Sequence, residues 1–428
     1  MMEQDQPEQE RTKQDNRIFR LNGKVQHYAW GGYSFLPRLL SVSDTEGKPF
    51  AEYWLGAHDN APSELVFTPP TGDTANWSLT VKLNQYIGEW PEDLLGAAIA
   101  QRFGRLPYLL KILDVRDMLS IQVHPSKKNA EKEFAEENKK GIPLSAPDRN
   151  YKDDNHKPEL MLALSDFWLL HGFKPEDELE QILQRTPELR FLWPVFVEQG
   201  YQGLYKTVMV MEPLKVNAIL QPLLDRILPA YENGRLSRRE EDFWAARAAL
   251  TFNEPGRIDR GIFSIYLFNL VNLLPGEAIF QDAGLPHAYL EGQNVEIMAN
   301  SDNVLRGGLT PKHIDVPELL KHIKFGETLP QVLQGARDDD HEGHISVFRT
   351  PAPDFELSRI GLPGDEIITI GVRSVEIFLV LEGELLVEEN PGNSFIRMKG
   401  EAFVAFDGAR VSLKAHKDSV VYRAAVPQ

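Results

Sequence analysis

Cysteine is absent from this chain of 428 residues. Disulfide bonds and thiolate metal sites are therefore excluded, and a metal ion would need nitrogen and oxygen donors. Long hydrophobic runs are also missing, so we expect no membrane-spanning helix. Residues 1–16 are rich in Gln, Glu and Asp and lack the apolar segment of a signal peptide. We expect them to be a disordered tail on a cytoplasmic protein.

Positive charge is scarce as well, because 46 Lys and Arg face 63 Asp and Glu, for a net charge of −17. Such a chain repels phosphate backbones and anionic lipids, so we expect neither a nucleic-acid nor a membrane partner. An anionic small substrate would require a local cationic pocket. The length predicts two or three domains. We expect a monomer, although the sequence does not exclude a homo-oligomer.

Two kinds of sequence pattern alternate along the chain. Short β-type runs separated by turn residues dominate before residue 174 and after residue 272. Between them, residues 174–256 are helical in pattern, with apolar residues from Val216 to Leu228 at i, i+3, i+4 and i+7 spacing. Pro222 should kink that helix or lie in its first turn. Nothing in this helical block suggests chemistry.

A weak internal repeat marks the β-type sequence. A Gly-Glu-Ala run is followed by another glycine eight residues after the first, at Gly276 and Gly284 and again at Gly400 and Gly408. Repeats of this kind indicate two copies of one structural unit. We therefore expect two β-barrel-like sandwiches.

The two copies differ where a metal ligand would stand. His287 in the first copy aligns with Val411 in the second. In the second copy, Val375–Val387 reads as a β-hairpin that turns at Gly383. The second unit should thus have the architecture without the metal.

Four polar residues from distant segments form a candidate metal site. Gln122 and His124 stand two apart in an apolar run, and on a strand such residues point to the same face. Glu159 and His287 supply a carboxylate and a second imidazole. Each residue alone is more commonly a surface or turn residue, but together they suit Zn²⁺, Mn²⁺ or Fe²⁺. The donor types do not choose among these ions.

Other polar residues crowd the same segments. They are Ser120, Lys157, Tyr289, Glu296, Asp302, Arg306 and Lys312. Lys111 lies inside an apolar strand, where a lysine points more readily into a cavity than into a core. This concentration of charge favours chemistry over a purely structural metal.

Several of these stretches resemble the type I phosphomannose isomerase family. The resemblance is carried by Leu119–Pro125, Asn155–Glu159, Pro286–Tyr289 and Glu296–Lys312, with shorter matches at Tyr28–Gly32 and Glu52–Gly56. The stretch from Asn300 to Lys312 is the most specific part. The likeness is dense around the candidate ligands and thin in the helical block.

The resemblance implies a mainly β fold with a helical insertion, built from two cupin (jelly-roll β-barrel) domains and an α-helical domain. The catalytic cupin would comprise residues 17–173 and 257–325, the insertion residues 174–256, and the metal-free cupin residues 326–428. It also implies an isomerase that interconverts mannose 6-phosphate and fructose 6-phosphate. One zinc ion would be held by Gln122, His124, Glu159 and His287.

Moving a carbonyl from C1 to C2 of a sugar requires a base that carries a proton between adjacent carbons through an enediol(ate). Lys157 and Glu296 are both candidates for this base, with Tyr289 as a relay. The developing oxyanion needs a fixed cation. We assign that role to Arg306, which precedes two glycines that let the backbone approach closely.

The substrate phosphate requires cationic and hydroxyl contacts. Ser120 with Lys157 or Lys312 would supply them, and Lys111 is an alternative to Lys157, which cannot serve as base and phosphate ligand together. Asp302 is grouped with these substrate-binding residues.

Two other functions fit parts of the sequence. An iron-dependent cupin oxygenase would prefer a histidine-dominated site, which Gln122 argues against. A non-catalytic sugar-binding cupin fits the second unit, but not the charged residues around Arg306. Metal content and a coupled isomerase assay separate the three functions.

Overall fold

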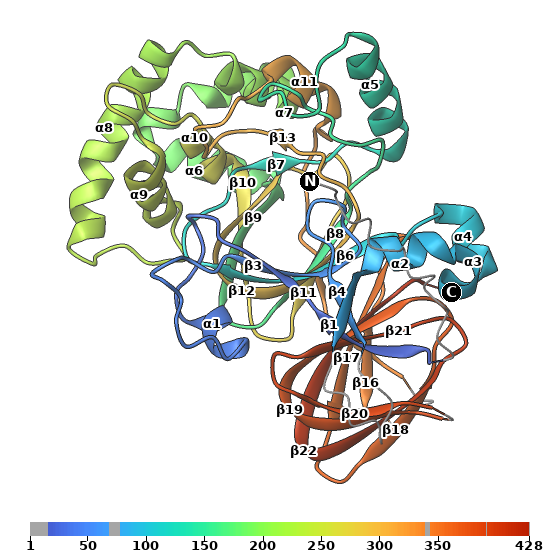
Figure 1. Cartoon of the computed structure of the whole chain (residues 1–428). Coiled ribbons are helices and arrows are strands. Elements are labelled where there is room, and N and C mark those ends of the chain that lie inside the picture. The colour runs from blue at the N-terminus through green and yellow to red at the C-terminus, as the bar shows by residue number, and fades with distance from the viewer. Residues whose placement is uncertain (1–15, 68–77, 339–342, 391, 428) are drawn as a thin grey trace, which may run out of the picture.

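Two antiparallel sheets of eleven strands each form the framework of this protein in a computed structural model, which describes residues 16–67, 78–338, 343–390 and 392–427. Figure 1 shows the C-terminal sheet at one end, the helices of the middle block at the other, and the second sheet between them. The expected mainly β fold is confirmed. All of the predicted tail except Asn16 lies outside the described residues.

The sheet next to the helices is called the site sheet. Its central path runs β14-β11-β8-β12-β6-β3-β2, and β7, β9, β10 and β13 join it through β12 and through one another. Its strands are β2 (Lys24–Gln26), β3 (Glu52–Gly56), β6 (Tyr108–Val115), β7 (Gln122–Val123), β8 (Glu159–Ala163), β9 (Phe167–Phe173), β10 (Phe268–Leu273), β11 (Ala278–Gln281), β12 (His287–Ala299), β13 (Leu305–Arg306) and β14 (Val332–Leu333).

The other sheet, called the C-terminal sheet, follows the order β15-β16-β17-β22-β19-β21-β1-β4-β5, with β18 paired to β22 and β20 to β19. Its strands are β1 (Ile18–Asn22), β4 (Glu64–Phe67), β5 (Leu79–Lys82), β15 (Ala336–Arg337), β16 (Ile345–Phe348), β17 (Glu356–Leu362), β18 (Ile367–Gly371), β19 (Glu376–Glu389), β20 (Ser394–Met398), β21 (Ala402–Ala405) and β22 (Arg410–Ala425).

Three N-terminal strands belong to the C-terminal sheet, although the sequence analysis placed residues 17–173 together in the first unit. β1 pairs with β21, Ile18 opposite Ala405 and Leu21 opposite Ala402. Local sequence does not encode which distant strand a segment will pair with. Here the backbone of β1 pairs with an edge of β21 whose N–H and C=O groups would otherwise lack partners, and the apolar side chains of β1 are buried.

The repeat noticed in the sequence is present in the backbone. Gly276, Gly284, Gly400 and Gly408 all have positive φ, between 79° and 90°. In each copy the two glycines flank a four-residue strand, β11 or β21, and a long strand follows, β12 or β22. Glycine is needed at these turns because other residues rarely adopt positive φ.

The predicted hairpin at 375–387 is wrong. β19 continues from Glu376 to Glu389 as one strand that pairs with β22, and its register shifts on both sides of Gly383. Gly383 has a φ of 90°, and a Cβ there would lie 2.1 Å from Ser419 Oγ. The Glu-Gly-Glu sequence therefore makes a bulge that bends the strand instead of reversing it.

The middle block is helical, as predicted. It contains α6 (Glu176–Arg185), a 3₁₀ turn (Pro187–Leu189), α7 (Leu192–Met209), α8 (Pro213–Glu232), α9 (Glu241–Phe252) and, just beyond, α10 (Gly261–Leu267). The apolar stripe of α8 is buried from Val216 to Ile227. Pro213 begins this helix, so Pro222 lies in its interior and does not mark its first turn.

The remaining helices are short, apart from the charged helix α5, which follows His124. They are α1 (Phe35–Leu39), α2 (Leu83–Glu89), α3 (Pro91–Leu95), α4 (Ala97–Phe103), α5 (Lys127–Lys139) and α11 (Val316–His322). In the parts of the chain that the structure describes, no helix has the length and apolar character needed to cross a bilayer.

A single apolar core joins the two sheets. It combines side chains of β6, β8 and β12 with side chains of β1, β19, β21 and β22. At its edge the buried Tyr108 hydroxyl lies 2.9 Å from the carbonyl oxygens of both Val375 and Ala424. The C-terminal sheet therefore packs directly against the sheet that carries the candidate site.

Candidate metal centre

Strand alternation directs three charged side chains into one cavity. Leu110, Leu160 and Ile297 lie in the core between the sheets, together with residues two positions away on the same strands. The neighbouring residues on β6, β8 and β12 must point to the opposite face. These neighbours are Lys111, Glu159 and Glu296, which line a cavity of about 50 Å³ together with Glu52, Gln122, Lys157, His287 and Tyr289.

Three of the four predicted ligands converge there. One donor atom from each of His124, Glu159 and His287 lies within 4.8 Å of the other two. The Nε2 atoms of His124 and His287 each lie 3.4 Å from one oxygen of the Glu159 carboxylate. All three residues are buried. The three segments that carry them meet only in the folded chain.

Hydrogen bonds fix the tautomer of both histidines. The Nδ1 atoms of His124 and His287 lie 2.8 and 2.9 Å from the carbonyl oxygens of Asn303 and Leu285. A carbonyl only accepts, so each Nδ1 donates, and in the neutral ring Nε2 is the nitrogen left with a lone pair.

Lone pairs that face one another in a buried space repel unless a cation lies between them. Among the described residues, His124 Nε2 has no hydrogen-bond partner, and burial lowers the pKa of this histidine to about 4, which keeps its ring neutral. Neutral imidazoles and a carboxylate are donors that zinc prefers. The donor set therefore fits a divalent metal ion.

Gln122 occupies the wall of the same cavity. Its backbone pairs with His287 on one side and with Arg306 on the other. Its predicted role as fourth ligand is compatible with this placement and stays a prediction.

Lys157 balances the charge of the buried Glu159 carboxylate. Lys157 Nζ lies 3.0 Å from Glu159 Oε1. Burial alone raises the pKa of Glu159, but the Lys157 ammonium group outweighs burial and holds this pKa well below its usual range. Glu159 is thus an anion, as a metal ligand must be.

A second group of charged side chains, centred on Lys111 and Glu296, lies in the same cavity as the Lys157–Glu159 pair. Lys111 Nζ is 3.1 Å from Glu296 Oε1 and 3.5 Å from Glu52 Oε2, while the Tyr289 hydroxyl donates to Glu296 Oε2 at 2.7 Å. Burial raises the pKa of Glu296. Burial lowers the pKa of Lys111, but Glu52 and Glu296 outweigh it, so the net pKa is raised. The network presents a carboxylate whose proton affinity is higher than usual.

Glu52 is the residue that the sequence analysis missed. It lies in the quoted stretch Glu52–Gly56 but received no role, and it lines the cavity beside Lys111. A carboxylate inside an apolar strand was the available signal, and the same logic had singled out Lys111.

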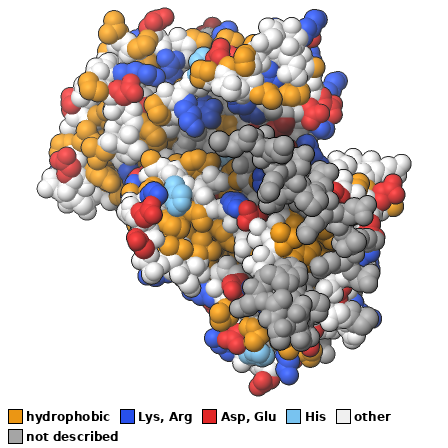
Figure 2. Space-filling view, in the orientation of Figure 1, with side chains coloured by type: hydrophobic (Ala, Val, Ile, Leu, Met, Phe, Trp, Pro, Cys, Tyr) orange, Lys and Arg blue, Asp and Glu red, His pale blue; other side chains and the backbone are white. Residues whose placement is uncertain are grey.

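Five predicted residues do not line this cavity: His124, which contacts it through Glu159, and Arg306, Ser120, Lys312 and Asp302. Arg306 is half-buried on β13, Ser120 is half-buried two residues before Gln122, and Lys312 is exposed. Burial lowers the pKa of both Arg306 and Lys312, and the charge of Arg306 lowers that of Lys312 further. Figure 2 shows Lys and Arg side chains gathered on this face, over the region of β7 and β13.

Asp302 is engaged elsewhere. Its carboxylate lies 3.2 Å from His58 Nε2 and accepts a hydrogen bond from Asn60 at 2.9 Å. Burial raises the pKa of Asp302, but His58 outweighs burial and the net pKa is lowered. A second carboxylate–histidine contact therefore stands next to the Asn303 carbonyl that orients His124.

The strand framework and its buried imidazole–carboxylate cluster define a mainly β protein built to hold a metal ion. The chain belongs to the type I phosphomannose isomerase family. Residues 18–176 match the family model for the phosphomannose isomerase type I catalytic domain. Mannose-6-phosphate isomerase of Escherichia coli K12 is 37% identical over 93% of this chain and 97% of its own. The human enzyme of the same name is 34% identical over 95% of this chain and 98% of its own.

Solved structures agree over nearly the whole chain. Mannose 6-phosphate isomerase from Salmonella typhimurium, bound to fructose 6-phosphate and zinc, has a TM-score of 0.83 and 33% identity, covering 96% of this chain and all of that one. A mutant phosphomannose isomerase from the same organism has a TM-score of 0.85 with the same coverage.

Proposed function

We propose that this chain is a zinc-dependent aldose–ketose isomerase that interconverts mannose 6-phosphate and fructose 6-phosphate. One observation carries the proposal: the buried His124–Glu159–His287 cluster occurs in a chain at least a third identical to mannose-6-phosphate isomerases along more than nine-tenths of its length. The Salmonella relative binds fructose 6-phosphate and zinc at once. The oxygenase and sugar-binding alternatives have no such support.

His124, Glu159 and His287 would hold the metal, with Gln122 as the fourth ligand. Bound there, zinc would act as a Lewis acid toward the sugar oxygens. The chain's own residues must then move the proton, support the developing negative charge and hold the phosphate.

Glu296 is our choice for the base that moves the proton between C1 and C2. Its carboxylate lies on the cavity wall, held by Lys111 at one oxygen and Tyr289 at the other. A carboxylate whose pKa is raised by burial takes up a proton from carbon more readily than an ordinary one. Tyr289 is placed to relay that proton.

Lys157 suits an electrostatic role better than that of base. It is paired with the ligand Glu159, and its ammonium group supports negative charge on the substrate oxygens beside the metal. Arg306 provides a second cation, from a strand whose partner is the strand of Gln122. Ser120 and Lys312 are our choices for the phosphate contacts, because both lie outside the narrow cavity, where a C6 phosphate can stay partly hydrated.

For the domain organisation we propose two cupin barrels, the first bearing the metal and the second without it. The conserved backbone of the glycine repeat supports a common architecture. β1, β4 and β5 would be assigned to the second barrel, because they hydrogen-bond in its sheet. A monomeric state and a cytoplasmic location remain the expected setting.

The test is a coupled isomerase assay on the purified protein, run before and after removal of metal with a chelator. We expect fructose 6-phosphate to form from mannose 6-phosphate, activity to disappear with chelation, and zinc to restore it. Full activity in metal-free protein would reject the zinc-dependent mechanism. No isomerase activity in zinc-loaded protein would reject the function.

A further inference from the structure

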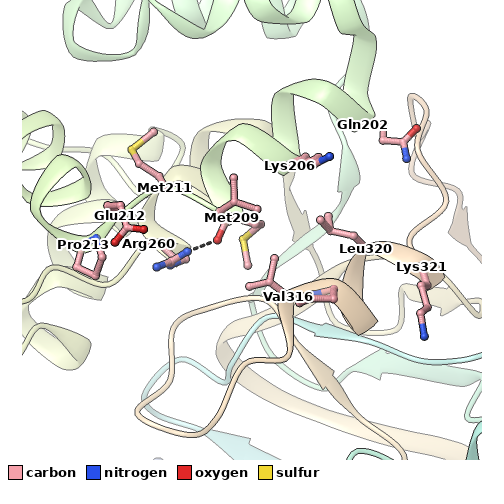
Figure 3. Close-up of a pocket in the computed structure, with 12 residues that line it drawn as sticks. Gln202, Lys206, Met209, Met211, Glu212, Pro213, Arg260, Val316, Leu320 and Lys321 are labelled. Atoms are coloured by element: carbon pink, nitrogen blue, oxygen red, sulfur yellow. Dashed lines mark hydrogen bonds between the residues drawn. The ribbon is translucent and has the colours of Figure 1, made fainter.

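A large cavity lies outside the metal centre, between the helical block and α11. It measures about 590 Å³, and its walls come from the end of α7, the start of α8, Arg260 and α11. In Figure 3, Arg260 and Glu212 lie on one side, Lys206 and Leu320 on the other, and Met209 between them. Small-molecule sites have volumes of roughly 300–1,000 Å³ and favour boundaries between structural units.

The lining combines an apolar floor with a cationic rim. Met209, Val316 and Leu320 contribute apolar surface, and Lys206, Arg260 and Lys321 contribute positive charge. The only acidic residue in the lining is Glu212. In a chain with a net charge of −17, three cations against one carboxylate is an unusual local balance.

Two of these cations lack a carboxylate partner within the described ranges. Arg260 donates to the Met209 carbonyl oxygen. Burial lowers its pKa, although the carboxylates of Asp259 and Glu212 act in the opposite direction. Its other N–H groups are thus partly desolvated, with no carboxylate of the described residues in ion-pair contact. Lys206 is exposed on α7. Lys321, in contrast, is paired with Glu318.

We propose that this cavity binds a small amphipathic anion, with a carboxylate or phosphate head group and an aliphatic body. The head group pairs with the free N–H donors of Arg260, whose planar fork matches either oxyanion. The body covers Met209, Val316 and Leu320. Lys206 adds positive potential at the opposite rim.

The test uses the zinc-loaded full chain and isothermal titration with octanoate and octyl phosphate. Octanol and octyltrimethylammonium serve as neutral and cationic probes with the same body. We expect both anions to bind at least tenfold more tightly than the other two probes. Equal binding of octanol would reduce the site to an apolar patch and overturn the proposal, as would no binding by either anion.

Substitutions of the two unpaired cations test whether the anion binds in this cavity. Arg260→Gln and Lys206→Glu should each weaken anion binding at least tenfold, whereas Lys128→Glu, which makes the same charge change as Lys206→Glu on α5, should not. Lys206 is exposed, so its variant tests the site even if Arg260→Gln fails to fold. Displacement of octyl phosphate by fructose 6-phosphate, or equal binding by Lys206→Glu and Lys128→Glu, would overturn the assignment.

A second inference concerns Asp259, a buried carboxylate at the start of α10. Its Oδ1 accepts backbone N–H bonds from Gly261 at 2.7 Å and Leu309 at 2.8 Å, and its Oδ2 accepts one from Thr310 at 3.1 Å. Two of these donors belong to the loop that follows Arg306. The carboxylate thus ties the segment before α10 to the loop after β13.

The backbone of this loop has positive φ angles at two successive residues, Gly308 and Leu309. Leu309 is fully buried with a φ of 54°, a region that residues other than glycine rarely adopt. Gly308 has a φ of 126°, and a Cβ on it would lie 2.5 Å from Gly261 Cα. Strained backbone of this kind persists only when its surroundings fix it.

We infer that Asp259 is a positioning residue for Arg306, which rests on the role of Arg306 in the proposed function. Asp259→Asn replaces one acceptor oxygen with an NH₂ group, so either the Thr310 amide or the amides of Gly261 and Leu309 lose their acceptor. The loop would loosen, and we expect kcat to fall about tenfold with zinc content unchanged. Asp225→Asn, an exposed change of the same kind on α8, is the control.

A double-mutant cycle separates positioning from general stability. In an Arg306→Ala background, Asp259→Asn should cause no further loss of kcat, because its effect passes through Arg306. An equal loss in both backgrounds, or wild-type kcat in the single variant, would overturn the inference. Asp259→Glu keeps the charge but displaces it, and the same kcat measurements on this variant test the inference if the Asn variant is unstable. Inactivity of the wild-type chain would instead count against the proposed function.

Discussion

At the scale of single residues, the donor geometry of His287 sets the first expectation. Its Nδ1 is committed to a backbone carbonyl, so only Nε2 is available to a metal ion. His287→Ala should therefore lose most bound zinc and lower kcat by roughly 10³-fold or more. Zinc content by mass spectrometry, together with the isomerase assay, measures both.

The control for His287→Ala is His416→Ala, which removes an exposed histidine on the C-terminal sheet. It should leave zinc and activity at wild-type levels. A His287→Ala protein that is free of metal and fully active would show that the cluster has no part in catalysis.

Arg306 carries the second expectation at this scale. If its guanidinium stabilises charge that develops in the transition state, Arg306→Ala should lower kcat roughly 10²–10³-fold with zinc still bound. Arg306→Lys should recover only part of the loss, because an ammonium group cannot reproduce the planar fork. Steady-state kinetics for both variants, with the exposed Arg239→Ala as control, provide the measurement.

A rise in KM alone would contradict the assignment of Arg306 to the transition state. Such a result would place this residue among the groups that bind substrate equally in the ground state and in the transition state.

At the scale of elements, β19 depends on the bulge at Gly383. An alanine there would have a φ of 90° and a Cβ 2.1 Å from Ser419 Oγ and 2.5 Å from the Asp418 carbonyl oxygen. Gly383→Ala should lower the free energy of unfolding by about 1–3 kcal/mol. Chemical denaturation followed by circular dichroism measures it.

Gly371 offers a matched comparison, because it ends β18 with no neighbour within 4 Å of a built Cβ and no positive φ. Gly371→Ala should change the unfolding free energy by less than about 0.5 kcal/mol. Equal stability of the two variants would show that the strand does not need its bulge.

At the scale of the whole molecule, the duplicated architecture carries one metal site. The described residues contain a single group of three His, Asp or Glu side chains placed to share an ion. In the second copy, Val411 is buried where His287 stands in the first. Purified protein should therefore contain about one zinc per chain, since hydrated ions do not enter an apolar interior.

Stoichiometry by mass spectrometry and anomalous scattering from a crystal soaked in excess zinc would measure this. The double variant His124→Ala/His287→Ala should contain no zinc inside either barrel. An ordered ion on inward-facing side chains of the C-terminal sheet would contradict the prediction.

Local chemistry and periodicity are properties of the sequence, and they determined much of this protein. The absence of cysteine restricted the donors, two-residue spacing related Gln122 to His124, and 3.6-residue spacing marked α8. The glycine repeat indicated two related units because positive φ is a local demand of a turn. Resemblance of short motifs was enough to indicate the family.

Only the tertiary structure decided which distant segments meet. Strand pairing depends on contacts across hundreds of residues, so β1 joined the C-terminal sheet, and Gly383 became a bulge because β22 continued alongside it. The same pairing aligned Lys111 with Glu296 and added the unnoticed Glu52. It also placed Asp259, for which the sequence indicated no role, against the loop of Arg306, because backbone N–H groups without partners must be satisfied by whatever the fold brings near.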